Sequence, residues 1–201
     1  MSRITGATSA TPKHILLDAG CFFKNYDLTK TYAQNIAVAG ALLGATDGGG
    51  TFSAVPVVHN VAIDGVPTNT KGLHRIDEWT VTMTARMKEL TAANIAVALG
   101  AATSATVGSG DAETALVGAT RITANEDIDN GDYLTNLTWV GRLSGSDDPV
   151  IIVMKNAFSL NGFSINPADK AEAVGEYTLT GCYDLADLDD VPFAIYYPTV
   201  P

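Results

Sequence analysis

The clearest pattern in the sequence is a strict alternation of apolar and polar residues over positions 77–87. A period of two is typical of a β-strand that buries one face and leaves the other face polar. The apolar positions are Trp79, Val81, Met83, Ala85 and Met87, and the polar positions between them are Glu78, Thr80, Thr82, Thr84 and Arg86. We therefore expect Trp79, Val81 and Met83 to face the core of the protein.

A similar alternation over 55–63 predicts a second strand. The residues that would share one face are Val55, Val57, His59, Val61 and Ile63. Pro56 favours an edge position for this strand, because proline has no N–H group to donate to a neighbouring strand. Turn-forming residues fill 64–72, so we expect the two strands to pair as a long hairpin.

The remaining patterns predict a mainly β protein with one flanking α-helix. Thr91 can cap a helix over Ala92–Leu99, and Gly100 stands where a glycine commonly ends one. Ile95 and Leu99 would lie on the stripe that packs against a sheet. Further strands are predicted over 120–128, 133–143, 150–160, 176–185 and 193–197. This order of elements predicts a β-sandwich or an open barrel.

We expect residues 1–201 to form a single domain with three less regular segments. Residues 1–14 are small and polar and predict a flexible N-terminal arm. Glycines dominate 44–53, and Ala, Ser, Thr and Gly dominate 101–118, so both are predicted as loops or arms.

The glycine-rich loop is a candidate for contacts between subunits. Its four glycines make the loop costly to order, so we expect a neighbouring subunit to order it. The expected contact residues are Gly48, Gly49, Gly50 and Phe52, with Phe52 as the apolar anchor.

Composition and charge narrow the class of protein. The chain of 201 residues has a formal net charge of −10, which excludes a protein that grips the phosphates of nucleic acid with a basic face. No apolar run is long enough to span a membrane, and no secretion signal opens the chain. We expect a soluble protein made in a cytoplasm, with Cys21 and Cys182 as small buried side chains.

Candidate catalytic chemistry is sparse. His14, His59 and His74 are too few and too scattered for a zinc site. The acidic stretch 126–132 resembles a calcium loop, but Thr138 stands where the mechanism needs a glutamate. The cluster Asp184, Asp187, Asp189 and Asp190 reads as a solvated corner. We therefore expect no catalytic residues, no cofactor and no metal, and hence no enzyme.

Five segments along the chain carry a family resemblance. They are LDAGCFFKNYD at 17–27, LGATDGGGTF at 43–52, WTVTMTARMKELT at 79–91, YTLTGCYD at 177–184 and PFAIYYP at 192–198. In this order they resemble the major tail proteins, or tail tube proteins, of phages that infect Gram-positive bacteria. The stretch 101–118 has no counterpart in the resemblance.

The resemblance implies a structural protein of the virion. In that family, six subunits form a ring, and rings stack into a hollow tail tube that conducts the genome. The implied partners are further copies of the chain, a tape-measure protein, tail-tip or baseplate proteins and a tail terminator. DNA would pass through without specific binding, so the polar residues Glu78, Thr80, Thr82 and Thr84 are expected to line the channel. Further candidates on another strand are Glu176, Thr178 and Thr180. The plain alternative is that these threonines face outer solvent.

Other classes remain open at this stage. A head-decoration or fibre protein would share the composition but would form trimers or patches. A carbohydrate-binding module would expose aromatic residues, whereas Trp79 and Trp139 alternate with apolar residues and favour burial. An enzyme is the weakest alternative, because no catalytic group was found.

Overall fold

The computed structural model describes residues 5–167 and 169–200, and in these residues the fold is mainly β with antiparallel strand pairs. The strands are β1 (Leu16–Lys24), β2 (Thr46–Asn60), β3 (His74–Met87), β4 (Ala102–Thr106), β5 (Thr120–Ala124), β6 (Leu134–Leu143), β7 (Val150–Phe158), β8 (Ser164–Ile165), β9 (Gly175–Gly181) and β10 (Phe193–Tyr196). The helices are α1 (Tyr32–Ile36) and α2 (Ala92–Leu99), with 3₁₀ turns η1 (Thr11–His14), η2 (Thr114–Leu116) and η3 (Asn130–Asp132).

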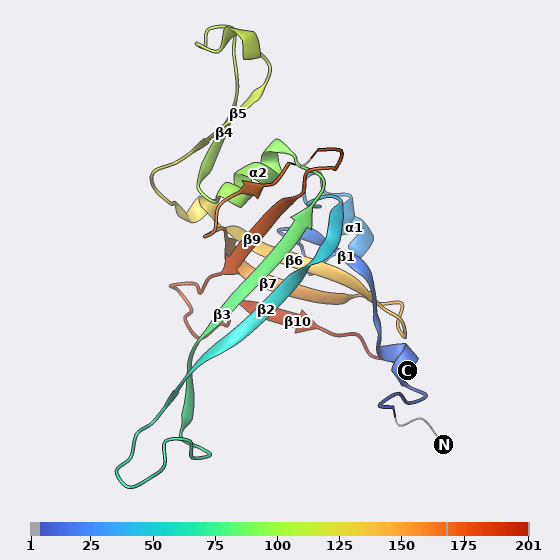
Figure 1. Cartoon of the computed structure of the whole chain (residues 1–201), viewed down its shortest axis with the longest axis vertical. Helices are drawn as coiled ribbons and strands as arrows, with labels where there is room; N and C mark the ends of the chain where they lie inside the picture. Colours follow the sequence, from blue (N-terminus) through green and yellow to red (C-terminus); the bar gives the residue numbers. More distant parts are fainter. Residues whose placement is uncertain (1–4, 168, 201) are drawn as a thin grey trace.

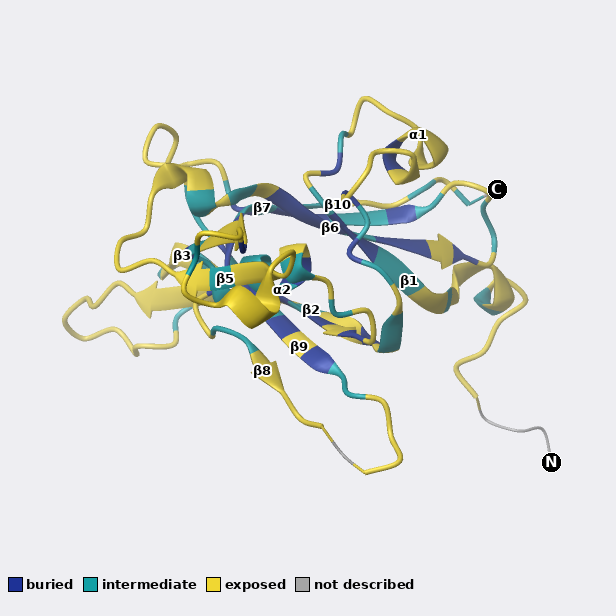
Figure 2. Ribbon diagram, turned by 90° about the horizontal axis from the view of Figure 1, so that it is seen from above, coloured by how far each residue is buried: buried dark blue, intermediate teal, exposed yellow. Residues whose placement is uncertain are grey.

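The main sheet folds into two layers that enclose the core (Figure 1). One layer holds β1, β6, β7 and β10, and the other holds β2, β3, β9 and β8. The layers join where β9 pairs with the end of β7. Buried side chains of both layers form one cluster, which includes Phe22, Leu137, Met154, Val81, Met83, Tyr177 and Leu179. Figure 2 shows this burial along β6, β7 and β9. The predicted mainly β fold is confirmed.

The alternation in β3 is borne out by burial. Val81 and Met83 are fully buried, and Trp79 is half-buried and packs against the same core. Phe52 and Ala54 of β2 lie opposite Met83 and Val81 and share their face. The predicted core face of this strand is therefore confirmed, and the hairpin with β2 is formed.

The predicted loop over 44–53 is a strand from Thr46 onward. Gly50 pairs with Ala85 of β3, and the register shifts between Thr46 and Gly50, which marks a bulge in β2. Gly48 and Gly49 have positive φ angles of 74° and 71°, so the glycines shape the bulge instead of loosening the chain. The loop prediction is wrong here because a glycine-rich pattern does not separate a bulged strand from a loop.

Two helices are present in the described residues, where one was predicted. α2 begins and ends as expected, since Thr91 Oγ1 accepts a hydrogen bond from the Asn94 N–H at 3.2 Å. α1 was missed, although Thr31 and Gln34 form a capping box, and that Thr-x-x-Gln spacing is readable in the sequence.

The segment 101–118 forms one side of a projecting arm. β4 pairs with β5 in a separate two-stranded sheet, which stands off the body beside α2 (Figure 1). The expected N-terminal arm is also anchored at its end. Residues 1–4 lie outside the described residues, but η1 contacts the β6–β7 turn, where the Ser144 hydroxyl donates to the Pro12 carbonyl.

Candidate assembly surfaces

The outer half of the β2–β3 hairpin, residues 55–76, projects from the body, and we call it the extension. β9 pairs with β3 only from Val81 to Met87. In the part of the chain that the structure describes, the extension therefore has no third strand beside it. Its exposed large apolar side chains are Val55, Val57, Val58, Val61, Ile63, Val66 and Ile76. A two-stranded hairpin is marginally stable alone in water, and an apolar surface of this extent marks an interaction site.

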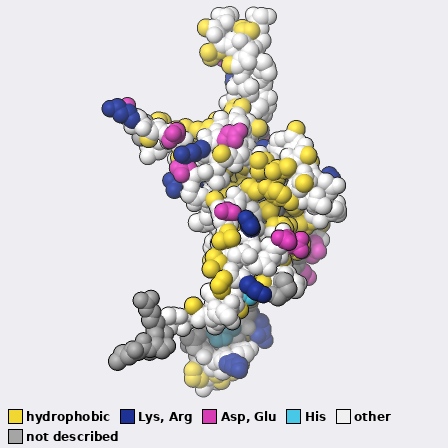
Figure 3. Space-filling view, turned by 90° about the vertical axis from the view of Figure 1, so that its right-hand side faces the viewer, with side chains coloured by type: hydrophobic (Ala, Val, Ile, Leu, Met, Phe, Trp, Pro, Cys, Tyr) yellow, Lys and Arg dark blue, Asp and Glu magenta, His cyan; other side chains and the backbone are white. Residues whose placement is uncertain are grey.

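Both faces of the extension are apolar. The register of β2 against β3 shifts between Val57 and Val58, where Asp77 is the extra residue of a β-bulge. Successive residues of a strand point to opposite faces, so Val57 and Val58 expose apolar surface on opposite sides. His59 Nδ1 lies 2.5 Å from Asp77 Oδ1 beside the bulge. Figure 3 shows hydrophobic, basic and histidine side chains together at this lower end of the molecule.

A second surface is rich in hydroxyl groups and spans two neighbouring strands. Thr82 lies opposite Thr180, and Thr84 lies opposite Thr178. The hydroxyl oxygens of Thr84 and Thr178 are 2.9 Å apart. Because Met83 between them is fully buried, these four threonines point away from the core. We call them the hydroxyl face.

The residues predicted to line a channel divide into two groups. Thr82 and Thr84 belong to the hydroxyl face. Glu78 and Thr80 lie farther out, where Val57 and Val55 are their partners on β2. The pattern of one strand could not show that these two polar residues stand beside exposed valines.

The predicted subunit contacts have roles within the chain. Phe52 packs against its own core, with its ring centroid 5.9 Å from that of Phe193. A Cβ atom at Gly50 would lie 2.6 Å from the ring of Phe22, so only glycine fits at this crossing of the layers. Phe52 is thus not a free anchor. A contact of Gly48 or Gly49 with a neighbouring subunit stays a prediction.

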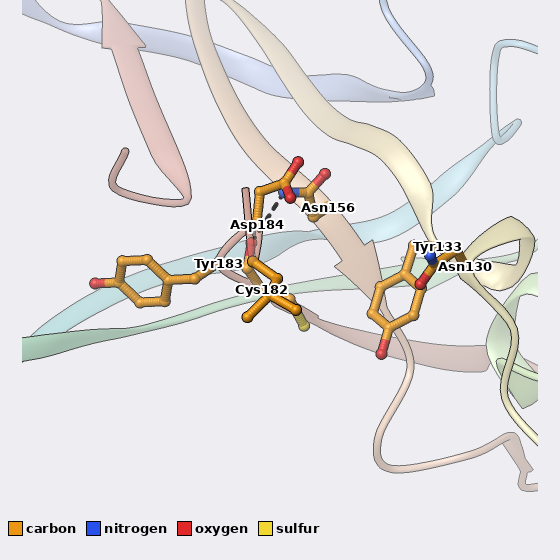
Figure 4. Close-up of a pocket in the computed structure, with 7 residues that line it drawn as sticks. Asn130, Tyr133, Asn156, Cys182, Tyr183 and Asp184 are labelled. Carbon is orange, nitrogen blue, oxygen red and sulfur yellow. Dashed lines mark hydrogen bonds between the residues drawn. The ribbon is translucent and has the colours of Figure 1, made fainter. Parts of the chain in front are cut away.

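A third surface surrounds an open pocket of about 390 Å³. Its lining residues are Asn130, Tyr133, Asn156, Cys182, Tyr183, Asp184 and Leu185. The lining joins the acidic segments 126–132 and 184–190, which are far apart in the sequence. We call the pocket and these two segments the acidic pocket. Figure 4 shows Tyr133 and Asn130 on one side and Cys182 and Asp184 on the other, with Tyr183 turned away.

Apolar side chains are exposed within the acidic pocket. Leu185 is 89% exposed and Leu188 is 62% exposed, and Ile128 and Tyr133 are exposed on the opposite segment. Lysine is nearly absent there: Lys155 Nζ binds Asp190 Oδ1 at 2.5 Å. Both acidic segments are apparent in the sequence, but no local pattern places them side by side. Leu185 and Leu188 lie within the second segment, and two leucines in an acidic stretch indicate a contact surface instead of a fully solvated corner.

Two hydrogen bonds hold the wall of the acidic pocket together, and its one thiol group is unreactive. Asn156 Nδ2 donates to the Cys182 carbonyl at 3.2 Å, and the Cys182 N–H donates to the Asn156 carbonyl at 3.2 Å. Burial raises the pKa of the Cys182 thiol. A raised thiol pKa keeps the sulfur protonated near neutral pH, so Cys182 is a poor nucleophile.

The histidines have separate partners. His14 Nδ1 lies 3.5 Å from the Tyr197 hydroxyl, and His74 Nε2 lies 3.3 Å from Asn69 Oδ1. Within residues 5–167 and 169–200, no three His, Cys, Asp or Glu side chains are grouped so that they could hold a metal ion. In the same described ranges, no helix has the length and apolar character needed to cross a membrane.

Comparison with known proteins adds no family assignment. No model of a known protein family matches the chain, and no similar curated protein is found. The fold and its surfaces define a mainly β protein with an apolar two-stranded extension, a hydroxyl face and an acidic pocket.

Proposed function

We propose that this protein is a structural virion protein that polymerises as stacked rings, six subunits to a ring, into a phage tail tube. The observation that carries the proposal is the extension. It exposes valine and isoleucine on both faces, and among the described residues no third strand pairs with it. Contact with further copies of the chain would bury this surface, and a polymer supplies such copies at every position.

The hydroxyl face is the proposed wall of the channel that conducts the genome. Thr82, Thr84, Thr178 and Thr180 form a continuous polar patch on β3 and β9. A wall of lysine or arginine would bind each passing phosphate, whereas hydroxyl groups carry no charge. Glu78 and Thr80 are better suited to the margin of the wall, because exposed valines stand beside them.

The mainly β fold and the resemblance of the five sequence segments also support a tail tube. A tube of this kind would meet a tape-measure protein inside, tail-tip or baseplate proteins at one end and a terminator at the other. The virion tail is then the proposed location.

Electron microscopy of the purified protein tests the proposal. Tubes with a central channel are expected for the wild type. The double variant Val58→Thr with Ile76→Thr keeps β-branched residues in both strands, so it should fold and fail to form tubes. Leu28→Thr is the matched control, since Leu28 is exposed but lies outside the extension.

Two outcomes would overturn the proposal. Tubes of normal length from the double variant would show that the extension is not the assembly surface. Closed trimers from the wild type would favour a head-decoration or fibre protein instead.

A further inference from the structure

We propose that the acidic pocket of one subunit receives the extension of a second copy of this chain. The inference rests on the proposed function and deepens it, because it names the two surfaces that meet. The two surfaces complement each other in charge and in apolar character.

The charges at the tip of the extension and on the acidic pocket are opposite. The tip carries Lys71 and Arg75 against the carboxylate Asp64, whereas Asp77 and Glu78 lie at the base of the extension, beside Val57 and Val58. Lys71 and Arg75 are both exposed. The two segments beside the pocket carry eight carboxylates, of which Asp184 lines the pocket itself; they are Glu126, Asp127, Asp129, Asp132, Asp184, Asp187, Asp189 and Asp190. The one neutralising lysine there is already bound to Asp190.

Some of the carboxylates already bind backbone groups, whereas two others can accept a new cation. Asp129 and Asp132 cap each other's backbone in η3, and Asp184 accepts a hydrogen bond from the Ala186 N–H at 2.9 Å. Glu126 and Asp127, by contrast, are exposed and form no ion pair within 4.0 Å among the described residues. They are therefore available to pair with a basic side chain of another subunit.

Apolar surface is present on both sides of the proposed contact. The extension offers Val61, Ile63 and Val66 near its tip, and the acidic pocket offers Leu185 and Leu188. Burial of this surface would supply most of the stability, because transfer of apolar surface out of water is favourable. The charges would set the orientation and the rate of association more than the strength.

The arrangement in space favours a contact between copies. In Figure 1 the tip of the extension points away from the body. The acidic pocket lies on the body, because its lining residues Cys182 and Tyr183 follow directly on the end of β9. Two different surfaces of one chain that fit each other make a heterologous contact. Repetition of such a contact gives a closed ring or an open helical assembly.

Carbodiimide cross-linking tests the contact directly, because this reagent joins an amine to a carboxylate in direct contact. A mixture of ¹⁵N-labelled and unlabelled protein is cross-linked after assembly and digested for mass spectrometry. Links between Lys71 and the segments 126–132 or 184–190 are expected, with one peptide labelled and the other unlabelled. Links confined to single molecules, or to other carboxylates, would overturn the inference.

Charge reversal provides a second test. Lys71→Glu with Arg75→Glu should raise the concentration needed for assembly by about tenfold or more, which corresponds to about 1.4 kcal/mol. Asp127→Lys with Asp187→Lys should do the same. All four changes in one chain should restore part of the lost assembly, because each introduced glutamate then has an introduced lysine with which to pair. The matched control is Arg142→Glu with Lys170→Glu, which changes the net charge as much as the first variant does.

The results separate this inference from the proposed function. Tubes that form without the expected links, or without rescue by the fourfold variant, overturn the contact and leave the tail tube standing. Links and rescue in rings or filaments that never become tubes support the contact and overturn the tube. A wild type that stays monomeric at all concentrations overturns both.

Discussion

Asn136 of β6 holds the backbone of Tyr26 through a reciprocal pair of hydrogen bonds. Asn136 Oδ1 accepts from the Tyr26 N–H at 2.8 Å, and Asn136 Nδ2 donates to the Tyr26 carbonyl at 3.0 Å. The Thr138 hydroxyl donates to the same Oδ1 at 2.9 Å. All three residues are buried. The clasp fixes the chain where it leaves β1, and so connects the edge of the sheet to its interior.

Replacement of this clasp should be costly. Asn136→Ala leaves a buried N–H and a buried carbonyl without partners, and each unsatisfied group costs about 1–3 kcal/mol. We expect the free energy of unfolding in urea to fall by about 2–4 kcal/mol. The control Asn161→Ala, at an exposed position, should change it by less than about 0.5 kcal/mol. Equal stability of the two variants would contradict the clasp.

Trp79 is expected to stabilise the junction of the two layers. Its ring centroid lies 5.4 Å from that of Phe193 on β10, and it packs against the core. Trp79→Ala should lower the free energy of unfolding by about 3 kcal/mol, the lower end for a large aromatic, because Trp79 is only half-buried. Thr80→Ala on the opposite face is the control. An unchanged melting temperature for Trp79→Ala would refute the assignment of faces in β3.

Local patterns predicted local features of this fold well. The bounds of α2 followed from Thr91 and Gly100, since capping depends on neighbours in the chain. The face of α2 was predicted less well, because the buried positions are Asn94 and Ala98 instead of Ile95 and Leu99. Asn94 Nδ2 donates to the carbonyl of a residue far along the chain, and no periodicity of the helix reports such a contact.

β1 shows a second limit of sequence patterns. Its register shifts between Leu17 and Cys21, and Asp18 and Gly20 have positive φ angles of 63° and 68°. This bulge interrupts the alternation of apolar and polar residues by which strands are recognised. The strand was therefore absent from the elements predicted for this part of the chain.

Stability should depend on pH through Asp27. Hydrogen bonds from the Thr29 hydroxyl and the Thr29 N–H, together with Lys30, lower the pKa of the Asp27 carboxyl to about 2. In the unfolded chain this pKa is about 3.9. The folded state is therefore favoured by the ionised carboxylate above about pH 4, and this contribution is lost as the pH falls towards 2.

Two measurements check this dependence. Titration by NMR should give Asp27 a pKa well below the value of about 3.9 for the unfolded chain. The loss of stability between pH 5 and pH 2.5 should be smaller in Asp27→Asn than in the wild type, whereas Asp64→Asn should behave as the wild type does. A pKa of Asp27 in the ordinary range would refute the prediction.

The position of the hydroxyl face in assembled tubes can be measured by accessibility. Thr82→Cys should react with a polymer-linked maleimide in free subunits and be protected from it in tubes. A small maleimide enters a channel and should label the same cysteine in both states, which controls for loss of reactivity. Peptide mapping separates this label from Cys21 and Cys182. Equal reaction with the large reagent in tubes would place Thr82 on the outer surface.

The sequence predicts the candidate surfaces less completely than it predicts the fold. Alternation predicted that Thr82 and Thr84 share a face, but only the register of β3 against β9 brings Thr178 and Thr180 beside them. The acidic pocket joins segments that are more than fifty positions apart, and no local pattern connects them. Long-range pairing decides such sites, and a single sequence does not report it.

Pro56 affects whether a further strand can add to the free edge of β2. The Trp79 N–H donates to the Tyr183 hydroxyl at 2.8 Å, so Trp79 and its partner Pro56 form a non-hydrogen-bonded pair, and the nitrogen of Pro56 faces the free edge of β2. An added strand would find no donor there. A proline at this position disfavours addition of a strand to the valine-rich edge, and such addition is the step that begins cross-β stacking of the amyloid kind. Contacts of a second copy with this edge then depend on side-chain packing, which permits fewer arrangements than backbone hydrogen bonding does. The missing N–H group of Pro56 therefore favours an ordered assembly.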